Sequence, residues 1–286
     1  MARYLIGIAI FTLMALAGTP TSYTDSIKAW QEHRNAGLRK PDSWLTLVGL
    51  FWLNPGDNTI GSASTNNFVL PKSSAPAEVG TLHLDGDKIT FHPSDGSAPR
   101  PLSYDGEQPD VIQAGSVSFF VIKRGDRFAI RAKDSQSPTL KNFAGLTFFP
   151  VNPDLHFEAK FIPDVEKIPI LSVLGTTDLE ESPGIVEFTY HGQTHHLRPI
   201  YEGKTLFFLF KDLTNKDLTY QAGRMLNTPL PVDGKVDLDF NRAYNPPCTF
   251  TPYATCPLPP KENHLPFAVD AGEKRYGKGH AELPTT

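Results

Sequence analysis

The stretch SVSFFVIKRGDRFAIRAK, residues 116–133, decides the fold class of this 286-residue chain. Apolar side chains alternate with polar ones on both sides of Arg124-Gly125-Asp126, a glycine turn. An alternation with a period of two around such a turn predicts an antiparallel β-hairpin, here formed by residues 116–123 and 127–133.

The same pattern recurs along the chain. It predicts hairpins from residues 81–84 with 88–92 and from residues 185–191 with 194–200, each around a glycine turn. Single strands are predicted at residues 157–162, 168–173, 206–210 and 236–240. Short strands with turn signals between them predict a mainly β protein, with antiparallel sheets that form a sandwich or a barrel-like structure.

One helix is predicted near the N-terminus. Thr24 or Asp25 can cap it, and it ends before Pro41. The apolar run 44–53 that follows is predicted to be a strand pair or a strand-turn at the start of the core. We expect a single domain over residues 22–280 with an irregular C-terminal segment, the alternative being two β subdomains that meet near residues 150–165.

Residues 1–18 have the features of a signal peptide. Arg3 supplies a positive charge, residues 5–16 are mostly apolar, and Ala15-Leu16-Ala17 is a small-x-small cleavage signal. An uncleaved membrane anchor is the alternative, but the apolar run is shorter than the roughly 20 residues that span a bilayer. The sequence therefore predicts an exported protein, periplasmic or extracellular after cleavage near Ala17, which meets the membrane only during export.

Composition excludes some classes of function. The net charge is −4 and the chain has no arginine-rich run, so we expect no nucleic-acid partner. The sequence has no GxSxG, HExxH, Walker or GxGxxG motif, which removes the common local signatures but not catalysis itself. We predict no cofactor and no metal site, and the sequence leaves any protein partner open.

Both cysteines, Cys248 and Cys256, lie close together in a proline-rich stretch. In an exported protein their simplest interpretation is a disulfide that staples this loop. Two free buried thiols are one alternative. A metal site is another, with weaker support because the spacing is not CxxC and only His264 lies close downstream.

Polar residues gather at the ends of the last predicted strands. Asp212 follows an apolar strand, and Asp239 and Asn241 share the strand face opposite to Leu238 and Phe240. An arginine here can bind a carboxylate or phosphate with two hydrogen bonds. The candidate ligand-binding residues are Asp212, Tyr220, Arg224, Asp239, Asn241, Arg242, Asn245 and, as an outer candidate, Glu273.

Three functional interpretations use this residue set. The first is a protein of the cell envelope that binds a small polar or anionic ligand. The second is a hydrolase-like enzyme in which Asp212 or Asp239 acts as general base and Arg224 or Arg242 stabilises negative charge. The third is a buried hydrogen-bond network with a purely structural role.

Four stretches resemble a known family. They are WLTLVGLFWLNPGDNTIGS (44–62), DSQSP with FAGLTFFPV (134–151), FKDLTNKDLTYQAGRML (210–226) and LDFNRAYNPPCTFTPYATCPLPPKENHLPFAVDAGEKRY (238–276). Through them the chain resembles the DUF1684 family of bacterial and archaeal proteins, which is named for having no assigned function. The resemblance implies that the stretches form one unit, and it supplies no reaction, substrate or cofactor.

Overall fold

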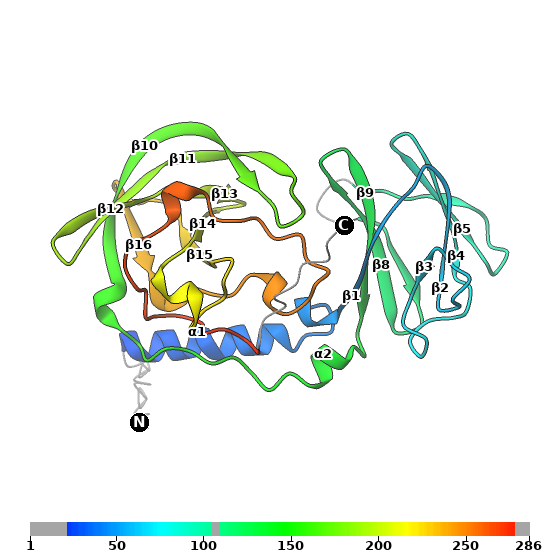
Figure 1. Cartoon of the computed structure of the whole chain (residues 1–286), viewed down its shortest axis with the longest axis horizontal. Coiled ribbons are helices and arrows are strands. Elements are labelled where there is room, and N and C mark those ends of the chain that lie inside the picture. Colours follow the sequence, from blue (N-terminus) through cyan, green and yellow to red (C-terminus); the bar gives the residue numbers. More distant parts are fainter. Residues whose placement is uncertain (1–21, 105–108, 278–286) are drawn as a thin grey trace, which may run out of the picture.

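The computed structural model describes residues 22–104 and 109–277. Two β lobes lie side by side, with the first helix along the base of the C-terminal lobe (Figure 1). Within the described residues the fold is mainly antiparallel β, and its sheets stay open, so the sandwich is confirmed over the barrel-like alternative. The predicted signal peptide falls outside the described residues. Among the described residues, no helix has the length and apolar character needed to cross a membrane.

The N-terminal lobe packs two sheets face to face. One sheet has the order β1-β9-β8-β7 and the other β3-β2-β4-β5-β6, with β2 and β3 parallel. The strands are β1 (Leu47–Trp52), β2 (Gly56–Gly61), β3 (Phe68–Val69), β4 (Gly80–Asp85), β5 (Lys88–Pro93), β6 (Arg100–Pro101), β7 (Val111–Ala114), β8 (Val117–Arg124) and β9 (Arg127–Asp134). Alternate side chains of β8, such as Phe119, meet Phe91 of the facing sheet in one buried core.

The C-terminal lobe is a second pair of sheets, ordered β12-β11-β10-β16 and β13-β14-β15. Its strands are β10 (His156–Leu171), β11 (Thr177–Tyr190), β12 (Gln193–Leu197), β13 (Ile200–Glu202), β14 (Thr205–Phe210), β15 (Arg224–Pro229) and β16 (Lys235–Asp239). Its core joins Phe188 of β11 to Phe208 and Phe210 of β14. The irregular segment after β16 packs on the same core through Leu265 and Val269.

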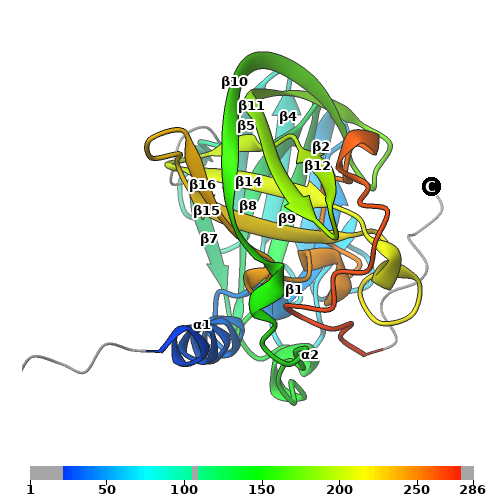
Figure 2. The ribbon, with the colours of Figure 1, turned by 90° about the vertical axis from the view of Figure 1, so that its left-hand side faces the viewer.

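Helix α1 (Tyr23–Leu38) belongs to the C-terminal lobe although it precedes the N-terminal lobe in sequence, and Figure 2 shows it end-on beneath the sheets. The structure corrects its predicted cap: Ser22, not Thr24 or Asp25, accepts a hydrogen bond from the backbone N of Asp25. A short second helix, α2 (Pro138–Lys141), lies in the connection between the lobes.

The three predicted hairpins are confirmed as β4–β5, β8–β9 and β11–β12. The run 44–53 is a 3-10 turn (Trp44–Thr46) followed by β1, which pairs with β9 rather than with itself. Residues 157–162 and 168–173 were predicted as separate strands, and that division is wrong. They form one strand, β10, with a register shift between Pro163 and Glu166.

Asp134 ends β9 and stabilises the turn after it. Its carboxylate accepts hydrogen bonds from Ser74 Oγ at 2.5 Å, Ser116 Oγ at 2.7 Å and the backbone N of Gln136 at 2.8 Å. Burial on its own raises the pKa of Asp134, but these hydrogen bonds outweigh it and leave the pKa lowered. The turn is therefore joined to a loop and a strand of the same lobe.

Replacing Asp134 by asparagine is expected to lower the free energy of unfolding at neutral pH by about 1–3 kcal/mol, because the amide cannot accept all three bonds. The folded-state pKa lies below the unfolded one, so this contribution is present above the unfolded pKa and is lost as pH falls through the folded pKa. Urea unfolding of both proteins from pH 7 to pH 3 should show the two stabilities converging in acid. A constant difference would contradict the assignment.

Candidate functional site

Asp212 and Arg224, two of the predicted site residues, form a wholly buried ion pair. Asp212 Oδ2 accepts from Arg224 Nη2 at 2.8 Å, and neither side chain is exposed to solvent. Asp212 follows β14 and caps a 3-10 turn, where its Oδ1 accepts from the backbone N and hydroxyl of Thr214. Arg224 also donates to the carbonyls of Val269 and Ala271. Burial lowers the pKa of Arg224 and the charge of Asp212 opposes that effect. This pair fastens the C-terminal segment to the sheet.

Asp239, Asn241 and Arg242 form a second group. Asp239 Oδ1 accepts from Tyr23 Oη and from the backbone N of Asn241, each at 3.0 Å, and its Oδ2 accepts from Arg242 Nε at 3.3 Å. Asn241 also exchanges two hydrogen bonds with the backbone of Asn152. Burial, and then the charge of Asp239, raise the pKa of Tyr23, so its hydroxyl stays protonated and donates. The group attaches the start of α1 to the end of β16.

Glu273 and Asn245 form a third group. Glu273 is fully buried and accepts from Arg34 Nε at 2.7 Å and from the backbone N of Asn245 at 2.8 Å. Asn245 Nδ2 donates to the carbonyl of Lys274 at 2.8 Å. Tyr220 lies apart from these groups, with its hydroxyl 3.4 Å from the carbonyl of Cys248, and burial raises its pKa.

The predicted residues therefore occupy separate networks. Asp212 and Asp239 are buried, and their carboxylates accept hydrogen bonds from donors of the protein. Neither residue lines the cavities described next. Arg224 lines a void of about 10 Å³, and only Asn245 reaches a cavity large enough for an organic ligand.

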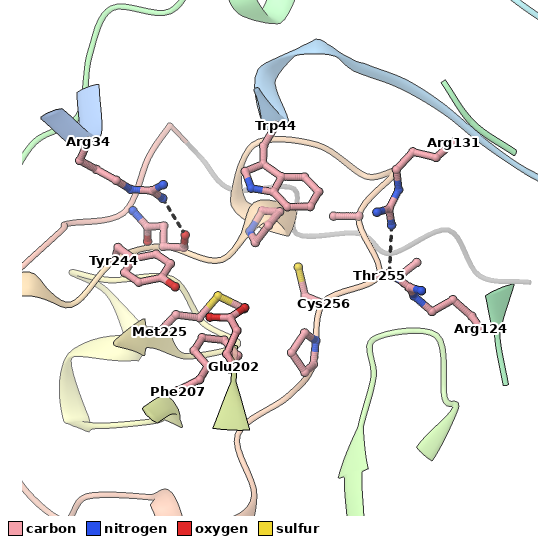
Figure 3. A pocket seen from close by; sticks show the side chains of 14 residues that line it. Arg34, Trp44, Arg124, Arg131, Glu202, Phe207, Met225, Tyr244, Thr255 and Cys256 are labelled. Carbon is pink, nitrogen blue, oxygen red and sulfur yellow. Dashed lines mark hydrogen bonds between the residues drawn. The ribbon is translucent and has the colours of Figure 1, made fainter. Parts of the chain in front are cut away.

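That cavity, of about 330 Å³, lies between the two lobes (Figure 3). The N-terminal lobe contributes residues from the turn before β1 and from β8 and β9. The C-terminal lobe contributes β13, β14, β15 and the loop after β16, and α1 adds Arg34. The residues around the cavity are Arg34, Trp44, Arg124, Arg131, Glu202, Phe207, Met225, Tyr244, Asn245, Pro247, Ala254, Thr255, Cys256 and Pro257. A second cavity of about 550 Å³ adjoins it and shares Arg124, Glu202, Phe207, Thr255 and Pro257.

Two arginines of one hairpin form the positive wall of this cleft. Arg131 Nη2 and Arg124 Nε both donate to the hydroxyl of Thr255, at 3.1 and 3.2 Å. Among the described residues neither guanidinium forms an ion pair with a carboxylate, and Arg131 is only 7% exposed, with its Nε left without a partner. Burial, and then the charge of Arg124, lower the pKa of Arg131 to about 10. Arg131 is thus charged at neutral pH, and the one carboxylate among the residues that line the cavity, that of Glu202, forms no ion pair with either arginine.

Apolar side chains form the middle of the cleft. Trp44 lies between the arginines of the hairpin and Arg34 in Figure 3, and it is 37% exposed although it is a large aromatic residue. The guanidinium of Arg131 lies 5.7 Å from its ring centroid. Phe207 and Met225 face the cavity from β14 and β15. An apolar surface with charged groups at its edge is typical of sites for small organic molecules.

The predicted disulfide between Cys248 and Cys256 is not present. Both cysteines are free buried thiols, 2.8 Å apart, and Cys256 Sγ accepts a hydrogen bond from the backbone N of Cys248 at 3.1 Å. Burial raises the pKa of Cys256. The hydrogen bond between the two thiols lowers the pKa of Cys248. Cys256 lines the cleft next to Thr255.

Sequence reasoning missed most of this cleft. Arg34, Trp44, Arg131 and Thr255 lie far apart in the sequence, and they meet only because α1 and the N-terminal lobe flank the C-terminal loop. Arg124 ends β8 opposite Arg127, whereas Arg131 lies within β9 opposite Phe120, so the two arginines of the cleft are not a cross-strand pair.

Comparisons with known proteins place this chain in a family. Residues 141–274 match the model of a family described as protein of unknown function (DUF1684), a span that contains strands β10 to β16 and the loops between them. The chain is 32% identical to an uncharacterised protein of Haloarcula marismortui with a solution NMR structure, over 47% of this chain and 78% of that one, with a TM-score of 0.40. No curated protein matches the chain. The chain belongs to the DUF1684 family, whose function is unknown.

Proposed function

We propose that this protein binds a small organic anion in the cleft between its two lobes. The observation that carries the proposal is the pair Arg124 and Arg131, which converge on Thr255 without a carboxylate partner among the described residues. A buried positive charge without a counter-charge is unfavourable, and a carboxylate or phosphate in the cleft would compensate it.

The apolar wall narrows the ligand class. Trp44, Phe207 and Met225 offer aromatic and aliphatic contact beside the arginines. An anion that carries an aryl or alkyl group would bury that group against them, whereas a bare inorganic anion would leave them exposed. The cavity volume of about 330 Å³ falls at the lower end of the range for small-molecule sites.

Residues 1–18 predict that the protein is exported. If it is, the protein would bind its ligand outside the cytoplasm, as a binding protein of the cell envelope.

The test compares 3-phenylpropanoate with its neutral isostere 3-phenylpropanamide by isothermal titration calorimetry. The anion is expected to bind at least about tenfold more tightly, because hydrogen bonds to charged groups contribute about 1.5–3 kcal/mol. Its affinity should fall in Arg124→Met and stay unchanged in Arg100→Met, since Arg100 is exposed on β6 in the other sheet of the lobe. Equal binding of the acid and the amide would contradict an anion site.

A further inference from the structure

The cleft has a negative wall as well as a positive one. Asp178 and Glu180 of β11 line the second cavity, and Glu202 of β13 lines both cavities. Asp178 and Glu202 are exposed and Glu180 is half-buried, so solvent reaches all three side chains. The arginines belong to the N-terminal lobe and the acids to the C-terminal lobe, and Figure 3 shows Glu202 across the cavity from Arg124 and Arg131.

The negative wall has no counter-ion in the protein. Among the described residues none of its three carboxylates forms an ion pair. Burial, and then the charge of Asp178, raise the pKa of Glu180, as expected for a carboxylate without a nearby cation. Glu202 Oε2 accepts from Asn227 Nδ2 at 2.6 Å, and Tyr244 Oη donates to Asn227 Oδ1 at 2.5 Å. These two bonds hold the Glu202 carboxylate in place.

The positive and negative walls do not neutralise each other. Arg124 directs its hydrogen bonds to the hydroxyl of Thr255 and to the carbonyl of Lys123. Lys123, which lines the second cavity, forms its ion pair with Asp87 of its own lobe, at 3.8 Å. A ligand that is only an anion compensates the arginines and is repelled by the acids. A ligand that carries both charges compensates both walls.

We infer that the ligand is an ω-amino carboxylate, in which an apolar spacer separates an acidic group from a cationic amino group. The acid pairs with Arg124 and Arg131, and the ammonium pairs with Glu180 and Glu202. The spacer packs on Phe207, which lines both cavities. This inference rests on the proposed anion site and adds the cation, which an anion site alone does not require.

The experiment compares three probes on the wild-type protein by isothermal titration calorimetry at neutral pH. They are 3-phenylpropanoate, 3-(4-aminomethylphenyl)propanoate, which adds an ammonium group, and 3-(4-hydroxymethylphenyl)propanoate, its neutral isostere. The aminomethyl probe is expected to bind about tenfold more tightly than the hydroxymethyl probe, because a surface ion pair contributes up to about fivefold and two carboxylates act together. An anion site without the negative wall predicts the opposite order, since the arginines repel an ammonium group.

Two variants assign the preference to the negative wall. The double variant Glu180→Gln/Glu202→Gln removes two charges, and an amide at position 202 can still accept from Asn227 Nδ2. The ratio of the aminomethyl to the hydroxymethyl affinity should fall to about one or below. Glu181→Gln is the matched control, because Glu181 is exposed on the face of β11 opposite to Glu180, and it should keep the wild-type ratio. If a variant does not fold, the wild-type order of the probes decides on its own.

The outcomes separate the two proposals. An aminomethyl probe that binds less than about threefold more tightly than the hydroxymethyl probe would overturn this inference and leave the anion site intact. A preference that survives in the double variant would also overturn it, since the ammonium would then bind elsewhere. Failure of all three probes to bind would overturn the anion site and this inference together.

Discussion

Replacing Arg224 by methionine is expected to lower the free energy of unfolding by about 3–5 kcal/mol, the usual loss when one partner of a buried ion pair is removed. The variant leaves the buried carboxylate of Asp212 without its counter-charge. It also leaves the carbonyls of Val269 and Ala271 without a donor, so the C-terminal segment loses its attachment to β15. Urea unfolding followed by circular dichroism measures the change.

A double variant separates the lost charge partner from the lost packing. Arg224→Met combined with Asp212→Asn removes both charges, so it is expected to be more stable than Arg224→Met alone. The exposed pair of Lys235 and Glu158 supplies the control, because Glu158→Gln should change stability little. If Arg224→Met lowers the free energy of unfolding by less than about 1 kcal/mol, the buried pair does not contribute substantially to the stability of the fold.

The hairpins could be predicted from the sequence because their information is local. In β8 and β9 the alternation and the glycine turn lie within eighteen residues, and pairing follows from them directly. The long strand β10 could not be predicted in the same way because it contains Pro163 and Pro169. Proline cannot donate to a neighbouring strand, but β16 pairs with β10 only over residues 156–160, so among the described strands the part of β10 that holds both prolines pairs with β11 alone.

The candidate site was only partly accessible to sequence reasoning, for a related reason. Polar residues close together in the chain, such as Asp239, Asn241 and Arg242, do meet in space. Their hydrogen bonds to one another and to Tyr23 and Asn152 make them a network that supports the fold. A ligand site contains polar atoms without protein partners. Whether a polar atom has a partner depends on which donors and acceptors the distant segments place near it.

Asn245 illustrates the difference. The sequence singled it out because it stands beside Arg242 in a polar stretch, yet its hydrogen bonds go to residues 273 and 274 and to α1. Its free Oδ1 follows from that tertiary arrangement. The residue was selected from its neighbours in the chain, and its hydrogen-bond partners are far from it in the sequence.

Replacing Arg131 by methionine is expected to stabilise the free protein and to weaken anion binding at the same time. Burial and the nearby charge of Arg124 disfavour the guanidinium, as the lowered pKa of about 10 shows. Methionine has a similar length and no charge, so the free energy of unfolding should rise by about 1–2 kcal/mol despite the loss of the bond to Thr255. The affinity for 3-phenylpropanoate should fall by about tenfold to a hundredfold.

A gain in stability together with a loss of anion affinity distinguishes an arginine that binds a ligand from one that stabilises the fold. Replacing a structural arginine such as Arg224 lowers the stability of the protein instead. Thermal unfolding and calorimetry of the same samples give both quantities, and Arg100→Met controls for the loss of one positive charge. The stability difference between wild type and Arg131→Met should also narrow as 3-phenylpropanoate is added, because the anion binds the wild type more tightly and stabilises it more. An Arg131→Met protein that is less stable and binds the anion as before would assign this arginine to the fold and remove the main support for an anion site.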